Sequence, residues 1–343
     1  RRQRQMCIRD SFHWELEFPE VFFDQYGRRK PNPGFDAVVG NPPWVESKFL
    51  PKPDKRYYQT RFQTMKGQYD LFTGFVETAR IVSNSQAYFG MILPNRFLAN
   101  PDYTAFRRFV VTSWSSLHVR DYGEGVFEDV AMPSCVLIAS PCKTYDLSVE
   151  SFTGAKFRIP YPRLSRIDEL TFRVDSTPEL ESVLDKVFGV SDSLKAHYSN
   201  ARGVEIGKSS NLIRTKGGAG YVPFGLGEDL HRYTFSPSKH LQLGDASVDY
   251  KSPELYQGPK LLVRKTGHGI NAALDVSDSY VIQVIYIFKG KPHSRLKDAF
   301  TLALLNSRLM FEIYYALFGE RHKQTFPHIR QAQFLQLPIR RIS

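Results

Sequence analysis

Phe35-Asp36-Ala37-Val38-Val39-Gly40-Asn41-Pro42-Pro43-Trp44 is the stretch that decides how this chain folds. Residues 35–39 are mostly apolar and predict a short strand, buried on both faces as parallel strands usually are. The two prolines that follow fix φ and offer no backbone donor, so the Asn41 side chain and a nearby carbonyl remain as hydrogen-bond acceptors. Trp44 can stack on a flat ring held between these groups. This combination suits the exocyclic amino group of a nucleobase.

The segments around this turn alternate between helical and strand patterns. Residues 45–66 are polar with little hydrophobic period, so they predict a loop. The elements expected around it are an extended segment over 14–18, a helix over 70–82, a strand over 88–93, a helix over 102–111, and strands over 117–122 and 135–139. The helix over 70–82 is expected to place four apolar residues on one face, namely Leu71, Phe75, Val76 and Ala79. This order predicts an α/β fold with a parallel core.

The pattern changes after about residue 145, and we expect a domain boundary between residues 147 and 148. The remainder has longer loops, including a glycine-rich stretch over 217–227. The elements expected there are a helix over 178–188, strands over 260–264 and 280–288, and a strong amphipathic helix within residues 296–317. Residues 148–343 are therefore predicted to form a separate mixed α+β domain.

Charge is distributed unevenly along the 343 residues, whose formal net charge is +11. Lys and Arg outnumber Asp and Glu by 19 to 17 in residues 1–150 and by 27 to 18 in residues 151–343. A basic half with interleaved aromatic residues favours contact with a polyanion, most simply a nucleic acid. A solvated basic surface is the alternative interpretation.

Cysteine content and hydropathy exclude several classes of protein. The three cysteines are too few and too scattered for a disulfide framework or a zinc site, so we expect no metal. The chain contains neither a signal peptide nor an apolar stretch of membrane-spanning length. We therefore expect no membrane partner and a cytoplasmic location.

Together these segments resemble the gamma-class N6-adenine DNA methyltransferases of restriction–modification systems, in the type IIG-like arrangement with a TaqI-type C-terminal specificity domain. The stretches that carry the resemblance are Asn41–Trp44, Gly90–Phe97, Val126-Phe127 ahead of Cys135–Ile138, Lys260–Val263, Leu302–Ser307 and Phe326–Ile329. The resemblance implies an α/β fold in which residues 1–147 form the C-terminal part of a Rossmann-like methyltransferase domain. Residues 148–343 would then form a mixed α+β target-recognition (specificity) domain.

The resemblance also implies an activity: site-specific methylation of double-stranded DNA in a prokaryotic restriction–modification or phage-defence system. The methyl donor would be S-adenosyl-L-methionine, and the target would be N6 of an adenine rotated out of the duplex. The catalytic residues would be Asn41, Pro42, Pro43, Trp44 and Phe127, with Asn41 and Pro42 also next to the cofactor. Trp44 and Phe127 would stack on the two faces of the adenine, and the Asn41 side chain and the Pro42 carbonyl would accept hydrogen bonds from its amino group.

One feature departs from the family. Its cofactor loop is a glycine-rich turn after an early strand, and residues 1–34 contain no such turn. The glycines over 217–227 follow no buried strand and are expected to form a specificity-domain loop. We therefore expect the cofactor site to need an N-terminal region of the same protein, and this chain alone to be inactive.

Basic residues of the second half are candidate DNA contacts, mostly to phosphate and less often to base edges. They are Arg264, Lys265, His268, Arg321, His322 and Lys323. A solvated surface charge is the alternative for any single one of them. DNA binding would place the protein at the nucleoid.

Two other functions stay open. The first is an amino-methyltransferase for cytosine N4, RNA or a protein glutamine amide, because Asn-Pro-Pro suits several planar amino groups. The large basic domain argues against a protein substrate. The second is a DNA-recognition module without catalysis that works with a partner subunit.

Overall fold

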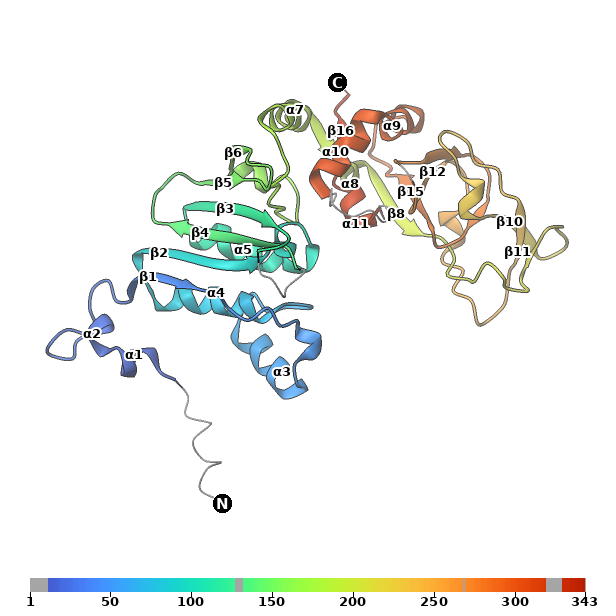
Figure 1. The fold of residues 1–343 in the computed structure, drawn as a ribbon. Helices are drawn as coiled ribbons and strands as arrows, with labels where there is room; N and C mark the ends of the chain where they lie inside the picture. The colour runs from blue at the N-terminus through green and yellow to red at the C-terminus, as the bar shows by residue number, and fades with distance from the viewer. Residues whose placement is uncertain (1–11, 127–131, 268, 319–328, 343) are drawn as a thin grey trace, which may run out of the picture. The chain divides into compact units, whose positions relative to one another are not determined.

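The computed structural model describes residues 12–126, 132–267, 269–318 and 329–342 (Figure 1). The chain divides into two compact units between Thr177 and Pro178. The boundary lies later than the one expected after residue 147, because two strands beyond that point extend the sheet of the first unit. They are β5 (Asp146–Glu150), which pairs with β3, and β6 (Lys156–Pro160), which pairs with β5.

A six-stranded sheet organises the first unit, with the strand order β1-β2-β4-β3-β5-β6. The first four strands are β1 (Phe35–Gly40), β2 (Ser83–Pro94), β3 (Ser116–Gly123) and β4 (Ser134–Ser140). The β1–β2 and β3–β5 pairs are parallel, whereas β4 is antiparallel to both β2 and β3. The α/β class is confirmed, but the expected parallel core is wrong. The sheet is mixed, because β3 and β4 are joined by a connection too short for a crossover.

Helices beside this sheet follow the expected order. The helix predicted over 70–82 is α4 (Leu71–Val82), and the one predicted over 102–111 comprises the 3-10 turn η4 (Pro101–Tyr103) and α5 (Thr104–Ser113). The short helices of the unit are α1 (Trp14–Glu17), α2 (Pro19–Phe22) and α6 (Tyr161–Leu164). The extended segment predicted over 14–18 is therefore wrong, since α1 occupies residues 14–17.

The predicted loop over 45–66 is also wrong in part. It contains the 3-10 turn η2 (Ser47–Phe49) and a helix, α3 (Lys52–Arg61). The sequence shows little hydrophobic period there because no residue of α3 is fully buried. Hydrophobic periodicity cannot predict a helix of this kind, because the helix has no buried apolar stripe.

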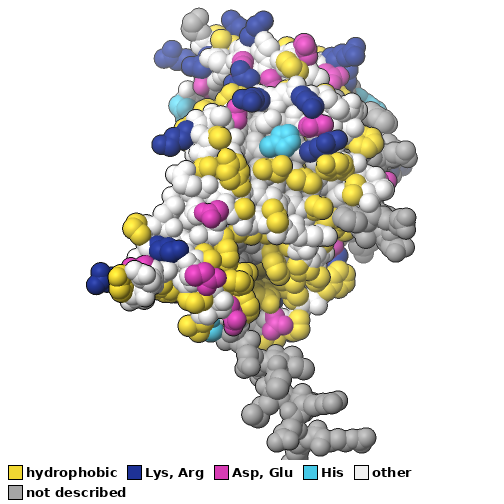
Figure 2. Space-filling view, turned by 60° about the vertical axis from the view of Figure 1, so that its left-hand side comes forward, with side chains coloured by type: hydrophobic (Ala, Val, Ile, Leu, Met, Phe, Trp, Pro, Cys, Tyr) yellow, Lys and Arg dark blue, Asp and Glu magenta, His cyan; other side chains and the backbone are white. Residues whose placement is uncertain are grey.

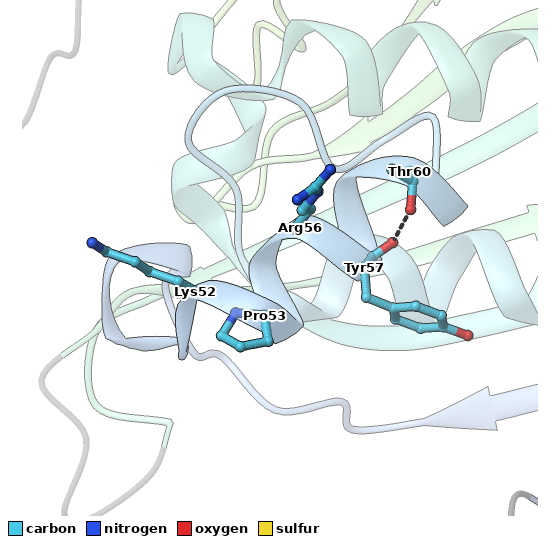
Figure 3. A pocket seen from close by; sticks show the side chains of 5 residues that line it. All are labelled: Lys52, Pro53, Arg56, Tyr57 and Thr60. Atoms are coloured by element: carbon cyan, nitrogen blue, oxygen red, sulfur yellow. Dashed lines mark hydrogen bonds between the residues drawn. The ribbon is translucent and has the colours of Figure 1, made fainter.

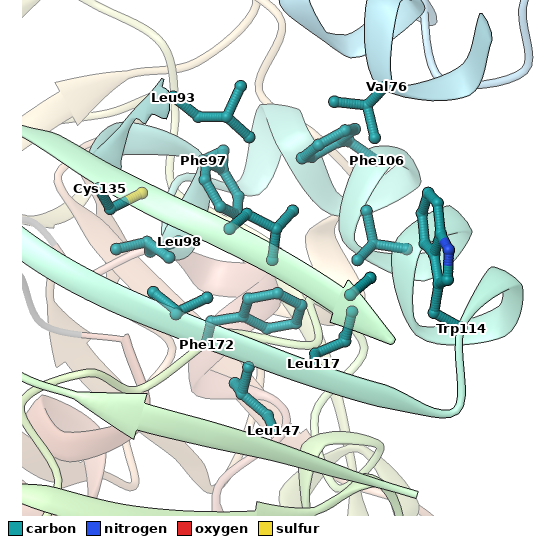
Figure 4. Packing of buried hydrophobic residues seen from close by; sticks show 14 of the residues in the cluster. Val76, Leu93, Phe97, Leu98, Phe106, Trp114, Leu117, Cys135, Leu147 and Phe172 are labelled. Atoms are coloured by element: carbon teal, nitrogen blue, oxygen red, sulfur yellow. The ribbon is translucent and has the colours of Figure 1, made fainter. Parts of the chain in front are cut away.

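Among the residues that the structure describes, the hydrophobic core of the first unit lies on one face of the sheet. Phe89, Met91 and Leu93 of β2 point into this core with Val76 of α4 and Phe106 of α5, as the close-up of the cluster shows in part (Figure 4). The aromatic rings pack edge to face, with 5.3 Å between the ring centroids of Phe97 and Phe106. Packing against this core fixes the positions of the carboxyl ends of β1 and β2.

The opposite face of the sheet exposes apolar side chains. Val39 is 81% exposed, and Tyr88 and Ile138 are exposed as well. In Figure 2, which brings the side of β1 and α2 forward, hydrophobic side chains gather in the lower half of the view. The strand over residues 35–39 is therefore not buried on both faces as predicted, because it is an edge strand and only Val38 packs against the core. Phe75 is likewise 48% exposed, since α4 buries the stripe of Phe72, Val76 and Ala79 instead.

The start of β1 is held close to β2. Gly34 has φ +124°, and a Cβ there would lie 2.5 Å from the backbone nitrogen of Asn84, so only glycine fits. The Asn84 side chain donates a hydrogen bond of 2.6 Å to the Asp36 carboxylate. These contacts fix the register of β1 and therefore the position of the turn that follows it.

A fully buried arginine secures the turns after β2. The Arg107 guanidinium, 0% exposed on α5, donates to three backbone carbonyls: Phe97 (2.5 Å), Asn100 (2.9 Å) and Glu169 (2.8 Å). Burial lowers the pKa of Arg107 to about 9, so the group stays protonated at neutral pH. It joins η3 (Asn95–Leu98) to the segment that follows α6.

The second unit contains two four-stranded sheets and a two-stranded one. The first sheet has the order β14-β10-β11-β9, with β9 (Ile213–Arg214), β10 (Tyr221–Gly225), β11 (Lys239–Gln242) and β14 (Tyr280–Val281). The second has the order β13-β12-β15-β8, with β8 (Tyr198–Arg202), β12 (Lys260–Arg264), β13 (Ala272–Asp275) and β15 (Ile285–Gly290). The third pairs β7 (Ser191–Ser193) with β16 (Pro338–Arg340). The 3-10 turns are η5 (Gly227–Asp229) and η6 (Pro253–Leu255).

Helices of the second unit are α7 (Pro178–Gly189), α8 (Leu194–His197), α9 (Asp298–Leu305), α10 (Arg308–Phe318) and α11 (Gln331–Phe334). The mixed α+β character is confirmed. The amphipathic helix expected within residues 296–317 is confirmed as α10, and α9 precedes it. The Asn306 side chain between the two helices bonds both backbone groups of Ala272 (3.0 and 2.9 Å). The strand predicted over 280–288 is divided into β14 and β15.

We expect Arg107→Met to lower the free energy of unfolding of the first unit by about 3 kcal/mol or more, because three buried carbonyls lose a charged donor. All three tryptophans of the chain lie in this unit, so tryptophan fluorescence in a urea titration follows its unfolding. The matched control is Arg108→Met, since Arg108 is exposed on the same helix and donates only to the Asp168 carbonyl (3.2 Å). Equal losses for the two variants would contradict this account.

Candidate functional site

The turn Asn41–Trp44 stands at the carboxyl end of β1, where β1 runs parallel to β2. Gly40 lies opposite Met91 in this register. Ligands commonly bind at the carboxyl ends of parallel strands. Asn41 and Pro43 are exposed, Pro42 is buried, and Trp44 is half-buried with its side chain packed against the core. The turn therefore combines an accessible amide with an anchored indole.

The Asn41 side chain makes no hydrogen bond with any residue that the structure describes. It does not cap a helix, because the next helical element, η2, begins only at Ser47 and has Glu46 at its N-cap. Gly40 before it also leaves space, since a Cβ there would meet only the Met91 methyl group at 3.7 Å. Gly40, which has no side chain, and the Asn41 amide, which has no described hydrogen-bond partner, are thus adjacent at the end of β1.

Backbone hydrogen bonds tie the continuation of this turn to the start of α4. The Ser47 amide donates to the Tyr69 carbonyl (2.7 Å), and the Leu71 amide donates to the Val45 carbonyl (2.9 Å). Between them Glu46 and Asp70 form an antiparallel bridge. Trp44 is therefore followed at once by a fixed segment, which limits the positions that its indole can take.

An ion-pair cluster reinforces this bridge from the end of β2. Arg96, in η3, pairs with the Asp70 carboxylate through one terminal nitrogen and with Glu46 Oε1 (3.0 Å) through the other. Lys48 Nζ lies 2.5 Å from the second oxygen of Glu46. Because Asp70 is only 1% exposed, the guanidinium is its main source of charge compensation.

The electrostatics of the cluster follow from burial and pairing. Burial raises the pKa of Asp70, and the Arg96 charge acts in the opposite direction. The hydrogen bond from Lys48, followed by that from Arg96, lowers the pKa of Glu46. Burial raises the pKa of Tyr103, which lies beside Asp70. Such a cluster holds a loop in place, because its charges are directed at one another.

Sequence reasoning missed this cluster. Arg96 lies in the Gly90–Phe97 stretch, just after the strand expected over 88–93, which is confirmed as part of β2. The roles of Glu46 and Asp70 could not be recognised, because their contact with Arg96 depends on the pairing of residues 45–47 with residues 69–71. The one signal available in the sequence was that these charged residues lie near the ends of the expected helices and strands.

The remaining predicted site residues are placed as follows. Phe127, His268, Arg321, His322 and Lys323 lie outside the described residues. Arg264 ends β12 and Lys265 follows it, and both are half-buried. The Lys265 amide donates to the Val284 carbonyl (2.8 Å), so its backbone is fixed. The structure thus brings Asn41 to Trp44 together in one unit, and Arg264 and Lys265 together in the other.

Arg264 has a feature of its own. Its Nε is buried and makes no hydrogen bond with any described residue. The nearby Glu228 has a lowered pKa, mainly because Lys208 donates a hydrogen bond to it, with Arg264 contributing charge. Within the described ranges we find no group of three or more metal-ligating side chains. No described helix has the length and apolarity needed to cross a bilayer.

We expect Arg96→Gln to lower the free energy of unfolding of the first unit by about 3 kcal/mol, because the buried Asp70 carboxylate loses its partner. Tryptophan fluorescence in urea measures the loss, and hydrogen exchange should become faster in residues 45–49. Arg80→Gln is the matched control, since Arg80 is half-buried on α4 and makes no ion pair with a described residue.

A double variant tests the cause. If the buried charge is responsible, Arg96→Gln with Asp70→Asn costs less than the sum of the single changes. Additive losses, or unchanged exchange in residues 45–49, would show that the cluster does not hold the loop.

Family comparisons match both units. Residues 3–127 match the Eco57I restriction-modification methylase family, and residues 222–339 match the TaqI-like C-terminal specificity domain. A Methanocaldococcus jannaschii protein named as a type II restriction enzyme and methyltransferase is 22% identical over 353 residues, which cover 96% of this chain and 28% of that protein. The type II restriction enzyme and methyltransferase RM.Eco57I of Escherichia coli is 25% identical over 201 residues, 55% of this chain and 19% of that protein.

Among solved structures, the type IIL restriction-modification enzyme MmeI in complex with DNA aligns with a TM-score of 0.46 and 12% identity, over 89% of this chain and 45% of that chain. This chain spans less than a third of the length of each of the two curated relatives named above. The match to the methylase family precedes the match to the specificity domain along the chain, which supports a type IIG-like arrangement.

Proposed function

From this combination of a restriction–modification methylase segment and a TaqI-like specificity segment, we propose that the protein is a site-specific DNA methyltransferase. It transfers a methyl group from S-adenosyl-L-methionine to N6 of an adenine that has been rotated out of the duplex. The observation that carries the proposal is the Asn41–Trp44 turn: an exposed amide without a described partner, beside an anchored indole, at the carboxyl end of a parallel strand pair. It acts in a restriction–modification or phage-defence system.

Rotation of the base is the first requirement, because the amino group of a stacked adenine cannot be reached. Unpairing costs a few kcal/mol, and stacking on an aromatic side chain returns about 1–3 kcal/mol per base. Trp44 supplies one such face, and its packing against the core on one side supports this role. Phe127 supplies the other face.

Asn41 and Pro42 then orient the amino group. The Asn41 side-chain oxygen and the Pro42 carbonyl accept its two N–H groups, which turns the nitrogen lone pair toward the methyl donor. A strong base is not needed before attack, because the proton leaves after the nitrogen has become cationic. Positioning and fixed dipoles supply most of the acceleration. The buried Pro42 and the bridged segment over 45–47 keep these acceptors in place.

S-adenosyl-L-methionine, when bound, supplies an electrophilic methyl group. The described residues fit one side of such a site: Gly40 leaves space at the strand end, and Asn41 and Pro42 border it. Residues 1–34 contain no glycine-rich turn after a strand. We therefore propose that this chain by itself does not transfer methyl groups, and that an N-terminal region of the same protein completes the site.

The second unit would read the DNA sequence in the cytoplasm, at the nucleoid. Arg264 and Lys265 contact DNA with His268, Arg321, His322 and Lys323, mostly at phosphates. The half-buried Arg264 supports this role, because its Nε makes no hydrogen bond with a described residue. An arginine at a strand end with a fixed backbone can present the rest of its guanidinium to a base edge.

In the protein produced from the complete reading frame, we expect Asn41→Ala to lower kcat for adenine methylation by about 10²–10³-fold, because an acceptor of the transition state is lost. The affinity for duplex DNA should change little. Methyl transfer to a DNA library, followed by nucleoside mass spectrometry, measures the first quantity, and fluorescence anisotropy measures the second. Asn211→Ala, which alters an exposed asparagine of the second unit, is the control and should retain full activity.

Other outcomes separate the alternatives. N4-methylcytosine instead of N6-methyladenine would point to the cytosine enzyme, and modified RNA would point to an RNA enzyme. Sequence-selective DNA binding without any methyl transfer by the wild-type protein would leave the recognition module. Wild-type turnover by Asn41→Ala would refute the role of the turn.

A further inference from the structure

The surface of α3 has a composition that the site described above does not use. This helix carries Lys52, Lys55, Arg56 and Arg61 against a single acid, Asp54. None of its four basic side chains makes an ion pair with a described residue. A basic helix that buries none of its residues gains little stability from packing, so its charges favour a role in binding an anionic partner.

One side of α3 is anchored to the first unit. Lys55, Tyr58 and Gln59 are half-buried on this side. The Tyr69 hydroxyl donates to the Lys55 carbonyl (3.4 Å), and Lys66 Nζ donates to the Gln59 carbonyl (2.5 Å). Because Tyr69 also accepts the Ser47 amide, the helix and the segment that follows Trp44 share one support.

The other side of α3 forms a shallow open groove. Figure 3 shows the side chains that line it, which are Lys52, Pro53, Arg56, Tyr57 and Thr60. Lys52, Arg56 and Thr60 recur every four residues and so lie along one face of the helix. Tyr57 is 61% exposed beside them. The Thr60 hydroxyl donates to the Tyr57 carbonyl (2.7 Å). The groove therefore offers two cations one turn apart and an exposed phenol, without a described acid on the same stripe.

We propose that this groove binds the phosphate backbone of duplex DNA next to the base held by the Asn41–Trp44 turn. The proposal rests on the proposed function for its location, since α3 begins only a short loop after Trp44. Phosphate is the partner that matches the chemistry: two cations without a described ion-pair partner for its charge, and the exposed Tyr57 hydroxyl as a donor to its oxygens. Contacts of this kind position a duplex without reading its sequence, so α3 would hold the strand while the target base leaves the stack.

The salt dependence of binding tests this directly. Each phosphate contact that is lost lowers the slope of log Kd against log salt by roughly 0.9. Lys52→Gln with Arg56→Gln should therefore reduce the slope by about 1.8, measured by fluorescence anisotropy of this chain with a duplex of random sequence. Both side chains are exposed, so circular dichroism and thermal unfolding should match the wild type.

Arg28→Gln with Lys143→Gln is the matched control. It removes the same charge from exposed residues before β1 and after β4, and both positions lie at the sheet end opposite to Asn41 because β4 is antiparallel to β2. Its slope should equal that of the wild type. An unchanged slope in the α3 variant, or equal reductions in both variants, would overturn the proposal. Equal reductions would mean that net charge alone acts.

This measurement does not depend on methyl transfer. A reduced slope for the α3 variant, combined with no methyl transfer by the protein from the complete reading frame, would sustain the groove and reject the proposed function. Normal methylation with an unchanged slope would reject the groove and sustain the proposed function. A groove that prefers RNA would bind a random RNA duplex more tightly than the DNA duplex, with the variant affecting only the RNA, and this result would also reject the proposal.

Discussion

The buried ion pair between Arg96 and Asp70 is the constraint on which the candidate site depends. Asp70 begins the segment that leads into α4, and Arg96 follows β2, so the pair joins the two elements that flank the carboxyl end of β1. Glu46 attaches the segment after Trp44 to the same guanidinium. A charge taken out of water is expensive unless it is paired. The segment after Trp44 is therefore held in one favourable position, and this fixes the position of the adjacent Asn41–Trp44 turn.

This arrangement divides the work within the turn. Pro42 is buried and Trp44 packs against the core, so both act as fixed walls. Asn41 stays exposed, with its amide open to a ligand. A rigid acceptor costs little to organise when a ligand binds, because the folded protein has already ordered it. The sheet contributes in a similar way, because its packed face fixes the strand ends, and the candidate site lies at those ends.

Local pattern predicted much of this fold. The helix over 70–82 and the strands over 117–122 and 135–139 could be read because each has a clear period and lies against the core. The turn at Asn41 could be read from residue chemistry alone. The expected parallel core failed, since strand direction depends on partners that are distant in sequence. The exposure of Val39 was missed for a related reason, because an apolar run does not tell whether a strand lies at an edge.

The charged features were harder to predict. Glu46, Asp70 and Arg96 resemble ordinary surface residues until the pairing of residues 45–47 with residues 69–71 is known. The helix α3 was hidden because it buries no apolar stripe. Both features acquire meaning from tertiary contacts, and both lie beside the turn. The sequence therefore indicated the candidate turn, while the structure showed which contacts hold it in place.

The most direct test is a structure of the protein from the complete reading frame bound to a duplex that contains its own methylation site. The account predicts an adenine outside the helical stack, with its N6 about 2.6–3.2 Å from the Asn41 side-chain oxygen and its ring against the Trp44 indole. An adenine that stays stacked, or one held by other residues while the Asn41 amide points away, would contradict it.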